Sequence, residues 1–436
     1  MTLESTFGGN DIRVGIIGLG YVGLPLTRAF WEAGLGVLGF DIDPEKVRTL
    51  AGGHSYLSSL GDALIQEMTA SGRFEATDVF ARLDEPSAIV ICVPTPLDAH
   101  FAPDLSFVER TADAVAAALR PGQLVVLEST TYPGTTRDVV RPRLEASGLR
   151  CGKDFFLAYS PEREDPGNRA HTTRSIPKLV GGVDDASGRA ATALYGQAVE
   201  TVVPVRNAEV AESAKLLENI YRAVNIALAN EMKVILTRMG VDIWEVIEAA
   251  STKPFGFQPF YPGPGLGGHC IPIDPFYLAW KARACATPTR FIELAGEINR
   301  AMPDYVVQRI MHALNERGQA VRGASILIMG LAYKPDVNDI RESPSIELIE
   351  RLQELGASVE YTDPHVPTTH PMREHDLKMS SVEVTPERLQ SYDCIVIATH
   401  HAAFDWQLVA DHGRLIVDTR NVMRDVVGAR GHVVGA

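Results

Sequence analysis

The residues with the clearest capacity for chemistry lie in a segment rich in proline and glycine, between positions 254 and 275. Its centre reads Gly267-Gly268-His269-Cys270-Ile271-Pro272-Ile273-Asp274. Glycines beside a cysteine let a substrate approach the sulfur closely. A thiolate can add to an aldehyde, and loss of a hydride from the adduct leaves a thioester that water cleaves. A buried structural cysteine is an equally weighted alternative for Cys270, and a structural role is expected for His269.

Two polar residues share one face of a predicted helix. Lys215 and Asn219 are four positions apart, so a helix places them one above the other. An amine and an amide aimed at one point could hold the oxyanion of a hydroxyl, aldehyde or thiohemiacetal. An ordinary exposed helix face is the alternative, and the pair gains meaning only beside the cysteine segment.

A glycine-rich turn indicates a dinucleotide site near the amino terminus. The turn reads Gly18-Leu19-Gly20-Tyr21-Val22-Gly23, after an apolar strand-like run, and a second such run ends at Asp41. Such glycines allow a tight turn and a close approach to pyrophosphate, and the carboxylate suits a ribose hydroxyl. Asp41 favours NAD over NADP, because its charge would repel a 2′-phosphate; Arg48 is the weaker counter-argument.

A second turn, Gly330-Leu331-Ala332-Tyr333-Lys334, echoes the first without the full fingerprint. A cation that follows a strand and precedes a helix suits a phosphate, so we expect Lys334, with nearby Arg341, to meet a ligand. Surface ion pairs among Asp339, Arg341 and Glu342 are the alternative.

Apolar strand-like runs alternate with helical patterns in both halves of the chain, which predicts parallel sheets covered on both faces. The expected strands lie at 13–17, 36–40, 88–93, 124–127, 155–158, 325–329, 358–361, 394–398 and 415–417. The expected helices lie at 22–33, 107–119, 135–146, 207–239, 275–283, 290–315 and 345–355. We therefore predict an α/β protein with two doubly wound Rossmann-like domains joined by a long central helix. The predicted domains are 1–206 for the cofactor, 207–317 with the cysteine segment, and 318–436 for the substrate.

Composition narrows the class of protein. The chain has 436 residues with a net charge of −14, which argues against a broad surface for nucleic acid or anionic membrane. No apolar run reaches the roughly 20 residues that span a bilayer, and no signal peptide is recognisable. Five cysteines without a C-x-x-C pair predict a reducing, cytoplasmic location. No cluster has metal-ligand spacing, and no metal is expected.

These residues resemble the UDP-glucose/GDP-mannose dehydrogenase family over essentially the whole chain. Seven motifs in order carry the resemblance: GLGYVG with Asp41; Val93-Pro94-Thr95-Pro96; Glu128-Ser129-Thr130-Thr131 with Pro133-Gly134-Thr135; Ser160-Pro161-Glu162-Arg163; Ala211-Glu212-x-x-Lys215-Leu216-x-x-Asn219; Gly267-Gly268-His269-Cys270-Ile271-Pro272-x-Asp274; and Gly330-Leu331-Ala332-Tyr333-Lys334 with Arg341-Glu342-Ser343-Pro344.

The resemblance implies a role for each matched residue. Cys270 would be the nucleophile, Lys215 and Asn219 would stabilise the oxyanion, Asp274 would assist proton transfer, and Glu162 would help to hydrolyse the thioester. The implied NAD contacts are Gly18, Gly20, Tyr21, Val22, Gly23, Asp41, Pro94, Thr95, Thr130 and Arg341. The implied substrate contacts are Glu162, Arg163, Lys215, Asn219, Phe260, Tyr261, Gly267, Tyr333 and Lys334.

The resemblance also implies a four-electron oxidation of a sugar CH₂OH with two NAD⁺, in a homodimer formed through the central helix or a higher oligomer. The cysteine segment, with Tyr277, Trp280 and Lys281 after it, is most similar to the branch that acts on UDP-N-acetylglucosamine. UDP-N-acetylmannosamine, UDP-N-acetylgalactosamine and UDP-glucose are the alternatives. The stretch Thr252-Lys253-Pro254-Phe255 lacks the arginine that crosses to a neighbouring subunit in UDP-glucose enzymes.

Two rival functions are weighed against this one. A two-electron dehydrogenase of a small hydroxy acid would need neither Cys270 nor a second α/β domain, and counting NADH per substrate separates it. A cofactor-binding sensor without activity would be expected to lack Lys215, Asn219, Cys270 or Asp274, and all four are present.

Overall fold

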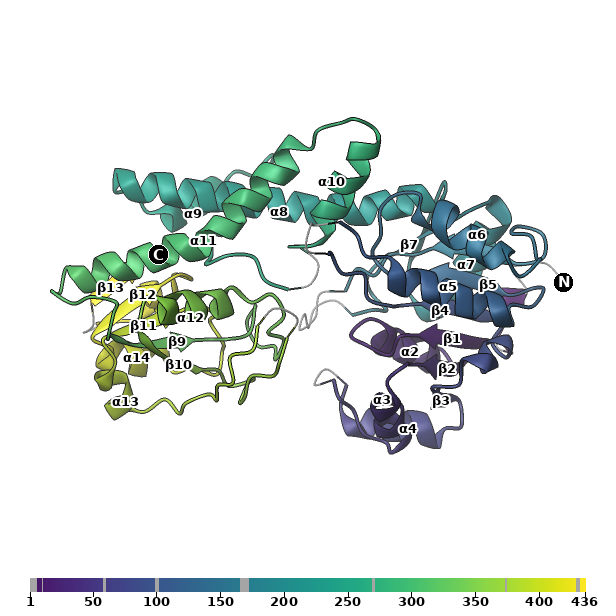
Figure 1. Ribbon diagram of the computed structural model, residues 1–436, viewed down its shortest axis with the longest axis horizontal. Helices are drawn as coiled ribbons and strands as arrows, with labels where there is room; N and C mark the ends of the chain where they lie inside the picture. Colours follow the sequence, from purple (N-terminus) through teal and green to yellow (C-terminus); the bar gives the residue numbers. More distant parts are fainter. Residues whose placement is uncertain are drawn as a thin grey trace. The chain divides into compact units, whose positions relative to one another are not determined.

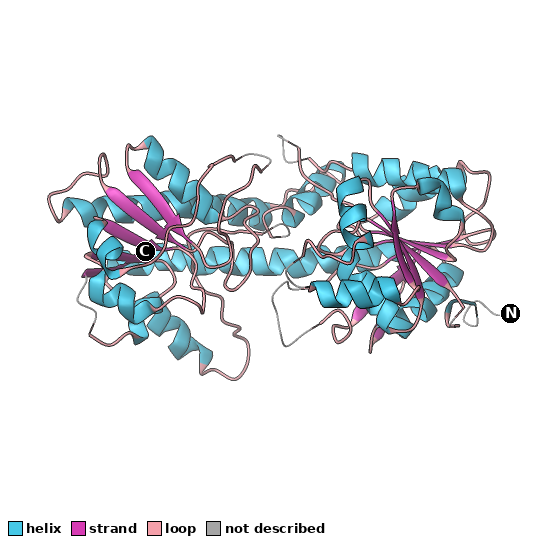
Figure 2. Ribbon diagram, turned by 90° about the horizontal axis from the view of Figure 1, so that it is seen from below, coloured by secondary structure: helices cyan, strands magenta, loops and turns pink. Residues whose placement is uncertain are grey.

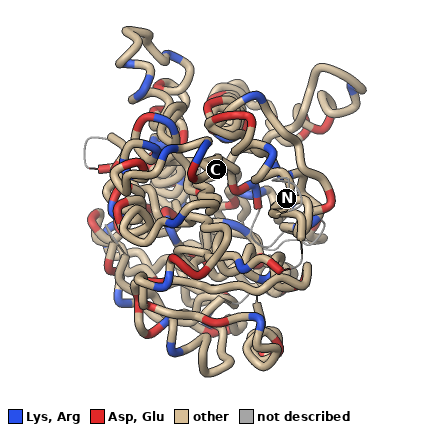
Figure 3. The backbone as a smooth tube through the Cα atoms, turned by 90° about the vertical axis from the view of Figure 1, so that its right-hand side faces the viewer, with Lys and Arg blue, Asp and Glu red and all other residues tan. Residues whose placement is uncertain are grey.

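The computed structural model describes residues 6–9, 11–57, 60–98, 102–164, 172–268, 271–372, 375–428 and 432–436. The chain forms two compact units. The first comprises Met1–Glu218 with Phe276–Thr287, and the second comprises Asn219–Pro275 with Pro288–Ala436. Within the described ranges, none of the helices is both long enough and apolar enough for a membrane crossing. Acidic and basic residues lie interspersed along the chain (Figure 3).

An eight-stranded sheet forms the centre of the first unit, in the order β3-β2-β1-β4-β5-β6-β7-β8 (Figure 1). Its strands are β1 (Arg13–Ile17), β2 (Gly36–Phe40), β3 (Phe74–Thr77), β4 (Ala88–Ile91), β5 (Leu124–Leu127), β6 (Phe156–Tyr159), β7 (Lys178–Gly182) and β8 (Val202–Val205). The first six are parallel, whereas β7 pairs antiparallel with β6 and parallel with β8. The order reverses between β1 and β4, where doubly wound sheets bind ligands.

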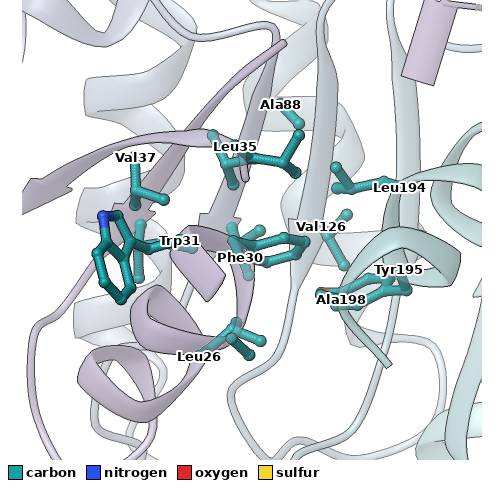
Figure 4. Close-up of a cluster of buried hydrophobic side chains, with 14 of the residues drawn as sticks. Leu26, Phe30, Trp31, Leu35, Val37, Ala88, Val126, Leu194, Tyr195 and Ala198 are labelled. Carbon is teal, nitrogen blue, oxygen red and sulfur yellow. The ribbon is translucent and has the colours of Figure 1, made fainter. Parts of the chain in front are cut away.

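Helices cover both faces of this sheet (Figure 2). They are α2 (Gly23–Glu32), α3 (Pro44–Ala51), α4 (Asp62–Ala70), α5 (Ser106–Ala118), α6 (Arg141–Glu145) and α7 (Asp185–Ala198), with short turns η1 (Phe80–Asp84) and η2 (Thr136–Val140). Phe30 on α2 and Tyr195 on α7 meet over the sheet, with ring centroids 5.8 Å apart, inside the core of Figure 4. Burying such large apolar side chains is the main stabilising term for the unit.

The expected long helix is confirmed as α8 (Ala208–Met239), which begins in the first unit and ends in the second. Glu212, fully buried, attaches its start to the first unit. The carboxylate accepts hydrogen bonds from Gly134 N (2.6 Å), Thr136 N (2.9 Å) and Thr136 Oγ1 (2.7 Å). Two of the sequence motifs, Pro133-Gly134-Thr135 and Ala211-Glu212, are therefore one structural contact.

The second unit contains a parallel sheet in the order β10-β9-β11-β12-β13. Its strands are β9 (Ser325–Met329), β10 (Ser358–Thr362), β11 (Cys394–Ile397), β12 (Leu415–Asp418) and β13 (His432–Gly435). The other helices of the chain are α9 (Ile243–Ser251), α10 (Asp274–Ala284), α11 (Arg290–Asn315), α12 (Pro344–Glu354), α13 (Pro386–Ser391) and α14 (Trp406–His412), with the turn η3 (Val422–Asp425). The expected pair of doubly wound sheets with a long helix between them is confirmed.

The two sheets begin with the same backbone turn. Gly18 and Gly330 both have positive φ, and a Cβ on either would lie 2.4 Å from a carbonyl oxygen of the neighbouring strand's end. Asp41 then accepts a hydrogen bond from Leu19 N (2.9 Å), and Asp363 accepts one from Leu331 N (2.7 Å). The echo seen in the sequence is therefore also structural.

Candidate active site

The glycine-rich turn of the first unit has the form that a dinucleotide needs. A Cβ on Gly23 would lie 1.9 Å from Gly18 O, so this glycine allows helix and strand to pack closely. Gly20 differs, because no described atom lies within 4 Å of its hypothetical Cβ. The open space at Gly20, at the start of α2, is where a pyrophosphate would approach the backbone. Tyr21 and Val22 complete the turn before α2 begins.

This difference predicts the effects of two substitutions. Gly20→Val should leave the melting temperature close to that of the wild type and raise the KM for NAD⁺ at least tenfold, because the side chain enters the space for the pyrophosphate. Gly23→Ala should instead lower the melting temperature, since its methyl group meets Gly18 O. Calorimetry and NAD⁺ titration check both; unchanged NAD⁺ affinity in Gly20→Val would contradict the assignment of the turn.

Asp41 is buried and held in place at the end of β2. It accepts hydrogen bonds from Leu19 N and from Asp43 N (3.0 Å). Lys46 Nζ lies 3.6 Å from its carboxylate, a contact that sequence analysis missed. Arg48, the residue that could favour NADP over NAD, lies on helix α3, as expected.

Two loops follow β4 and β5 at the same end of the sheet. Pro94 and Thr95 lie in the first, and Thr130 lies in the second. Ser129 Oγ donates to Val93 O (2.7 Å), which ties the loops together. The predicted cofactor residues of the first unit thus surround the switch point between β1 and β4.

The part of α10 that belongs to the first unit is attached to these same loops. Tyr277, fully buried on α10, donates through its hydroxyl to Thr95 O (2.8 Å). The rings of Trp280 and Tyr132 lie 5.0 Å apart, and Lys281 Nζ lies 4.8 Å from the Tyr132 centroid. These contacts fix residues 277–281 to the predicted cofactor loops within the first unit.

Cys270 and His269 lie outside the described residues, but their neighbours are described. Gly268 N donates to Arg341 O (3.1 Å). Cβ atoms on Gly267 and Gly268 would lie 2.6 Å and 2.9 Å from Tyr333 side-chain atoms. Only glycine fits against this ring, so the segment and the Tyr333 loop form one packed surface in the second unit.

Asn219 and Asp274 form a buried hydrogen-bonded pair in the second unit. Asn219 Nδ2 donates to Asp274 Oδ2 at 2.5 Å. Lys215 lies one helical turn before Asn219 on α8, and its side chain is also buried. The alternative of an ordinary exposed face is therefore wrong for this pair, because both side chains are buried.

Glu162 and Arg163 follow β6 in a loop that ion pairs and hydrogen bonds hold in place. Arg163 forms an ion pair with Glu218 on α8 (2.8 Å) and donates to Pro177 O (2.7 Å). Lys178 Nζ, buried, donates to Glu128 Oε2 (2.7 Å) and to Pro161 O (3.1 Å). Sequence analysis missed Lys178, because nothing in local spacing links it to Glu128.

Glu164, two residues after Glu162, has an altered acidity. Burial, and then the charge of Glu162, raise the pKa of Glu164 to about 8. The folded state therefore keeps a proton that the unfolded chain, with a carboxyl pKa near 4.5, releases. The free energy of unfolding should consequently fall as the pH rises through this interval.

Glu164→Gln should remove most of that dependence. We expect the variant to match the wild type near pH 4.5 and to be more stable than the wild type at pH 8 and above. Denaturant unfolding across this range measures it, with Glu67→Gln, an exposed glutamate on α4, as the control. A wild-type decline that persists unchanged in Glu164→Gln would contradict the assignment.

The loop after β9 carries Tyr333, Lys334 and Arg341. Arg341 forms a two-pronged ion pair with buried Asp339, with Nη2–Oδ2 at 2.6 Å and Nε–Oδ1 at 2.9 Å. The ion pair between Asp339 and Arg341, which was the alternative to ligand binding, is therefore present. Its carboxylate is buried and does not lie on the surface, as that alternative had assumed. Tyr333 N donates to Asp339 O (3.0 Å), so the same residue shapes the turn before Lys334.

Asp336, His365 and His401 bring three possible metal-ligand atoms within 4.8 Å of one another. His401 accepts a hydrogen bond at Nδ1 from Asp336 N (2.9 Å), and its Nε2 lies 3.0 Å from Asp363 Oδ2. Both ring nitrogens are thus engaged, and the cluster serves to hold the loop that follows Lys334. His401 lies in the loop that follows β11 and is fully buried.

Phe260 and Tyr261 lie beside aromatic partners in the second unit. Phe260 contacts Tyr221 of α8 edge to face, with centroids 5.5 Å apart. Tyr261 stacks on Trp244 of α9 at 5.6 Å. Phe260 also lines an apolar groove of about 680 Å³ between α8 and α9.

Comparison with known proteins now identifies the class. Three profiles of the UDP-glucose/GDP-mannose dehydrogenase family match the chain: the NAD binding domain over residues 12–199, the central domain over 209–301 and the UDP binding domain over 327–425. The chain belongs to this family. It is an NAD-dependent nucleotide-sugar dehydrogenase that acts on a CH–OH group.

Individual relatives cover nearly the whole chain. A UDP-N-acetyl-D-glucosamine 6-dehydrogenase from Pseudomonas aeruginosa is 34% identical over 418 residues, which is 95% of this chain and 96% of the relative. A UDP-N-acetyl-D-mannosamine dehydrogenase from Pyrococcus horikoshii is 35% identical over 420 residues, with the same coverage. A solved structure of a UDP-D-ManNAc dehydrogenase from Pyrococcus horikoshii has a TM-score of 0.87 at 33% identity, and covers 97% of this chain and 99% of that one.

Proposed function

We propose that this protein oxidises the C6 alcohol of UDP-N-acetylglucosamine to the uronic acid in two steps, through a covalent intermediate on Cys270. The observation that carries the proposal is the buried Asn219–Asp274 hydrogen bond, one turn from buried Lys215 on α8 and four residues from Cys270. An ionisable cluster of this kind is costly to bury, and such groups concentrate at functional sites.

Each residue has a role that its chemistry suits. NAD⁺ supplies the hydride acceptor when bound, once for each oxidation. Lys215 and Asn219 donate to the oxygen of the alcohol, the aldehyde and the adduct. Cys270 adds its thiolate to the aldehyde carbon, and loss of the second hydride from this adduct gives a thioester. A water molecule assisted by Glu162 then cleaves the thioester. Asp274 accepts from Asn219, which fixes the direction of that amide.

The second unit is proposed to hold the nucleotide portion. Lys334 would pair with the diphosphate as a point charge, and Tyr333 and Gly267 would line the site with it. Arg341 is proposed to reach the cofactor side, with Asp339 holding its guanidinium in position. The expected domains 1–206, 207–317 and 318–436 remain our proposal for the division of labour.

The N-acetylglucosamine assignment rests on the cysteine segment and on a relative that acts on that sugar. A relative of equal similarity acts on UDP-N-acetyl-D-mannosamine, which makes that sugar the first alternative. UDP-N-acetylgalactosamine and UDP-glucose are the remaining alternative substrates.

NADH formation with a panel of these four sugars and GDP-mannose tests the proposal. We expect the highest kcat/KM with UDP-N-acetylglucosamine, two NADH per sugar and no free aldehyde. One NADH per sugar would contradict the four-electron reaction. A tenfold preference for another sugar would contradict the substrate assignment alone.

A homodimer through α8 is also part of the proposal. Exposed apolar side chains on α8, α9 and the segment after them support it, among them Leu228, Met239 and Phe255. Light scattering of the purified chain measures the mass in solution. A reducing, cytoplasmic location is proposed as well, supported by free thiols at Cys92, Cys151, Cys285 and Cys394.

A further inference from the structure

A continuous chain of buried amides runs through the second unit to the cysteine segment. Asn299 Nδ2 on α11 donates to Ala223 O (3.1 Å), and Asn230 Nδ2 on α8 donates to Asn299 Oδ1 (2.9 Å). Gly263 N then donates to Asn230 Oδ1 (3.0 Å). Both asparagine side chains are buried, and Gly263 lies seven residues before Cys270.

The two ends of this row of hydrogen bonds fix the direction in which each hydrogen bond is donated. The row starts at a backbone N–H, which only donates, and ends at a carbonyl, which only accepts. Each amide between them must therefore accept with its oxygen and donate with its nitrogen. Apolar side chains of similar size could fill the same volume without desolvating two amides. The buried amides therefore point to a need to place the Gly263 backbone accurately.

The loop around Gly263 has no spare room on its other side. A Cβ on Gly263 would lie 2.5 Å from Arg420 Nη1, and one on Gly265 would lie 3.1 Å from Pro344 Cβ. Further along, Gly268 N donates to Arg341 O, and Asp274 accepts from Asn219. The described residues Gly263, Gly268 and Asp274, which lie on either side of Cys270 in the sequence, are thus each held by a hydrogen bond.

We propose that Asn230 and Asn299 are positioning residues that set the path of the backbone at Gly263, and that reaction at Cys270 depends on this path. This inference rests on the proposed role of Cys270 as the nucleophile. A displacement of about 1 Å at a reacting atom can cost on the order of 10²-fold in rate. Loss of the hydrogen bonds made by Asn230 and Asn299 should therefore lower kcat for acid formation, while the KM for NAD⁺ stays within twofold.

Asn299→Asp is the sharpest single test, because it changes one N–H₂ group into an oxygen. The ionised carboxylate can accept from Asn230 but cannot donate to Ala223 O. We expect kcat to fall 10- to 100-fold at pH 8 and to recover in part as the pH is lowered, because a protonated carboxyl regains a donor. Asn315→Asp, an exposed position at the end of the same helix, is the matched control and should behave as the wild type.

A double variant, Asn230→Leu with Asn299→Leu, is a second test. It removes the desolvation of both amides but takes from Gly263 N and Ala223 O the partners given above, so we expect a melting temperature below that of the wild type. We expect kcat per folded protein to be reduced 10- to 100-fold. The alkylation rate of Cys270 by iodoacetamide, followed by mass spectrometry without substrate, should change in both variants.

Wild-type kcat and an unchanged Cys270 alkylation rate in the folded variants would overturn the positioning role. Failure of the proposed function gives a different result, because Cys270→Ala would then still form acid.

Discussion

Cys270→Ala is expected to abolish formation of the acid. Without the thiol no thioester forms, and removal of a covalent nucleophile costs on the order of 10⁴-fold or more in rate. Lys215, Asn219 and the glycine-rich turn remain, so the first oxidation should still occur. Single-turnover assays should give one NADH per site, and mass spectrometry should find the aldehyde or its hydrate.

The matched control for this variant is Cys285→Ala. Cys285 is an exposed free thiol just after α10, so its loss should leave the rate unchanged. Acid formation at the wild-type rate in Cys270→Ala would remove the covalent mechanism and leave the family assignment intact. Loss of NAD⁺ binding in the same variant would instead indicate a structural cysteine, the alternative that the sequence left open.

The parts of the fold that could be predicted are those set by local patterns. Strands β1, β2, β5 and β9 have the expected bounds, because each is a short apolar run buried on both faces. Helix α8 begins one residue later than expected and ends as expected, since it lacks proline and glycine throughout. The turn at Gly18 could be recognised because only glycine tolerates that backbone at such close approach.

Elements with mixed or exposed sequences were missed. Strand β8 contains a proline and is partly exposed at the edge of its sheet, and β13 is an exposed edge strand. Neither has the apolar run of a central strand. The expected helix at 135–146 is, by contrast, helical over 136–145, as η2 followed directly by α6.

Contacts between distant residues could not be read from spacing. Asn219 and Asp274 were each singled out, but their hydrogen bond joins positions 55 residues apart. The ion pair of Lys178 with Glu128 spans 50 residues and left no local signal at Lys178. Both contacts are explained by burial, because a polar side chain that is shielded from solvent needs a hydrogen-bond partner within the fold.

Lys178→Met is expected to destabilise the first unit by about 3–5 kcal/mol, the usual cost of removing one partner of a buried ion pair. The loss leaves Glu128 buried with Tyr195 as its remaining partner, and Pro161 O without its donor. The double variant with Glu128→Gln should recover much of the loss. Arg424→Met, which breaks a more exposed ion pair with Glu248, should cost less than about 1 kcal/mol.

The pH dependence of Lys178→Met gives an independent check. Burial raises the pKa of Glu128, and Lys178 acts against that rise. Removing the lysine raises the pKa of Glu128 further, so the folded state holds a proton that the unfolded chain releases above its own carboxyl pKa. The destabilisation should therefore grow as the pH rises from about 5 and shrink in acid. Denaturant unfolding at several pH values measures this; a loss that does not vary with pH would mean that packing, rather than an uncompensated charge at Glu128, sets the stability of the loop that carries Glu162.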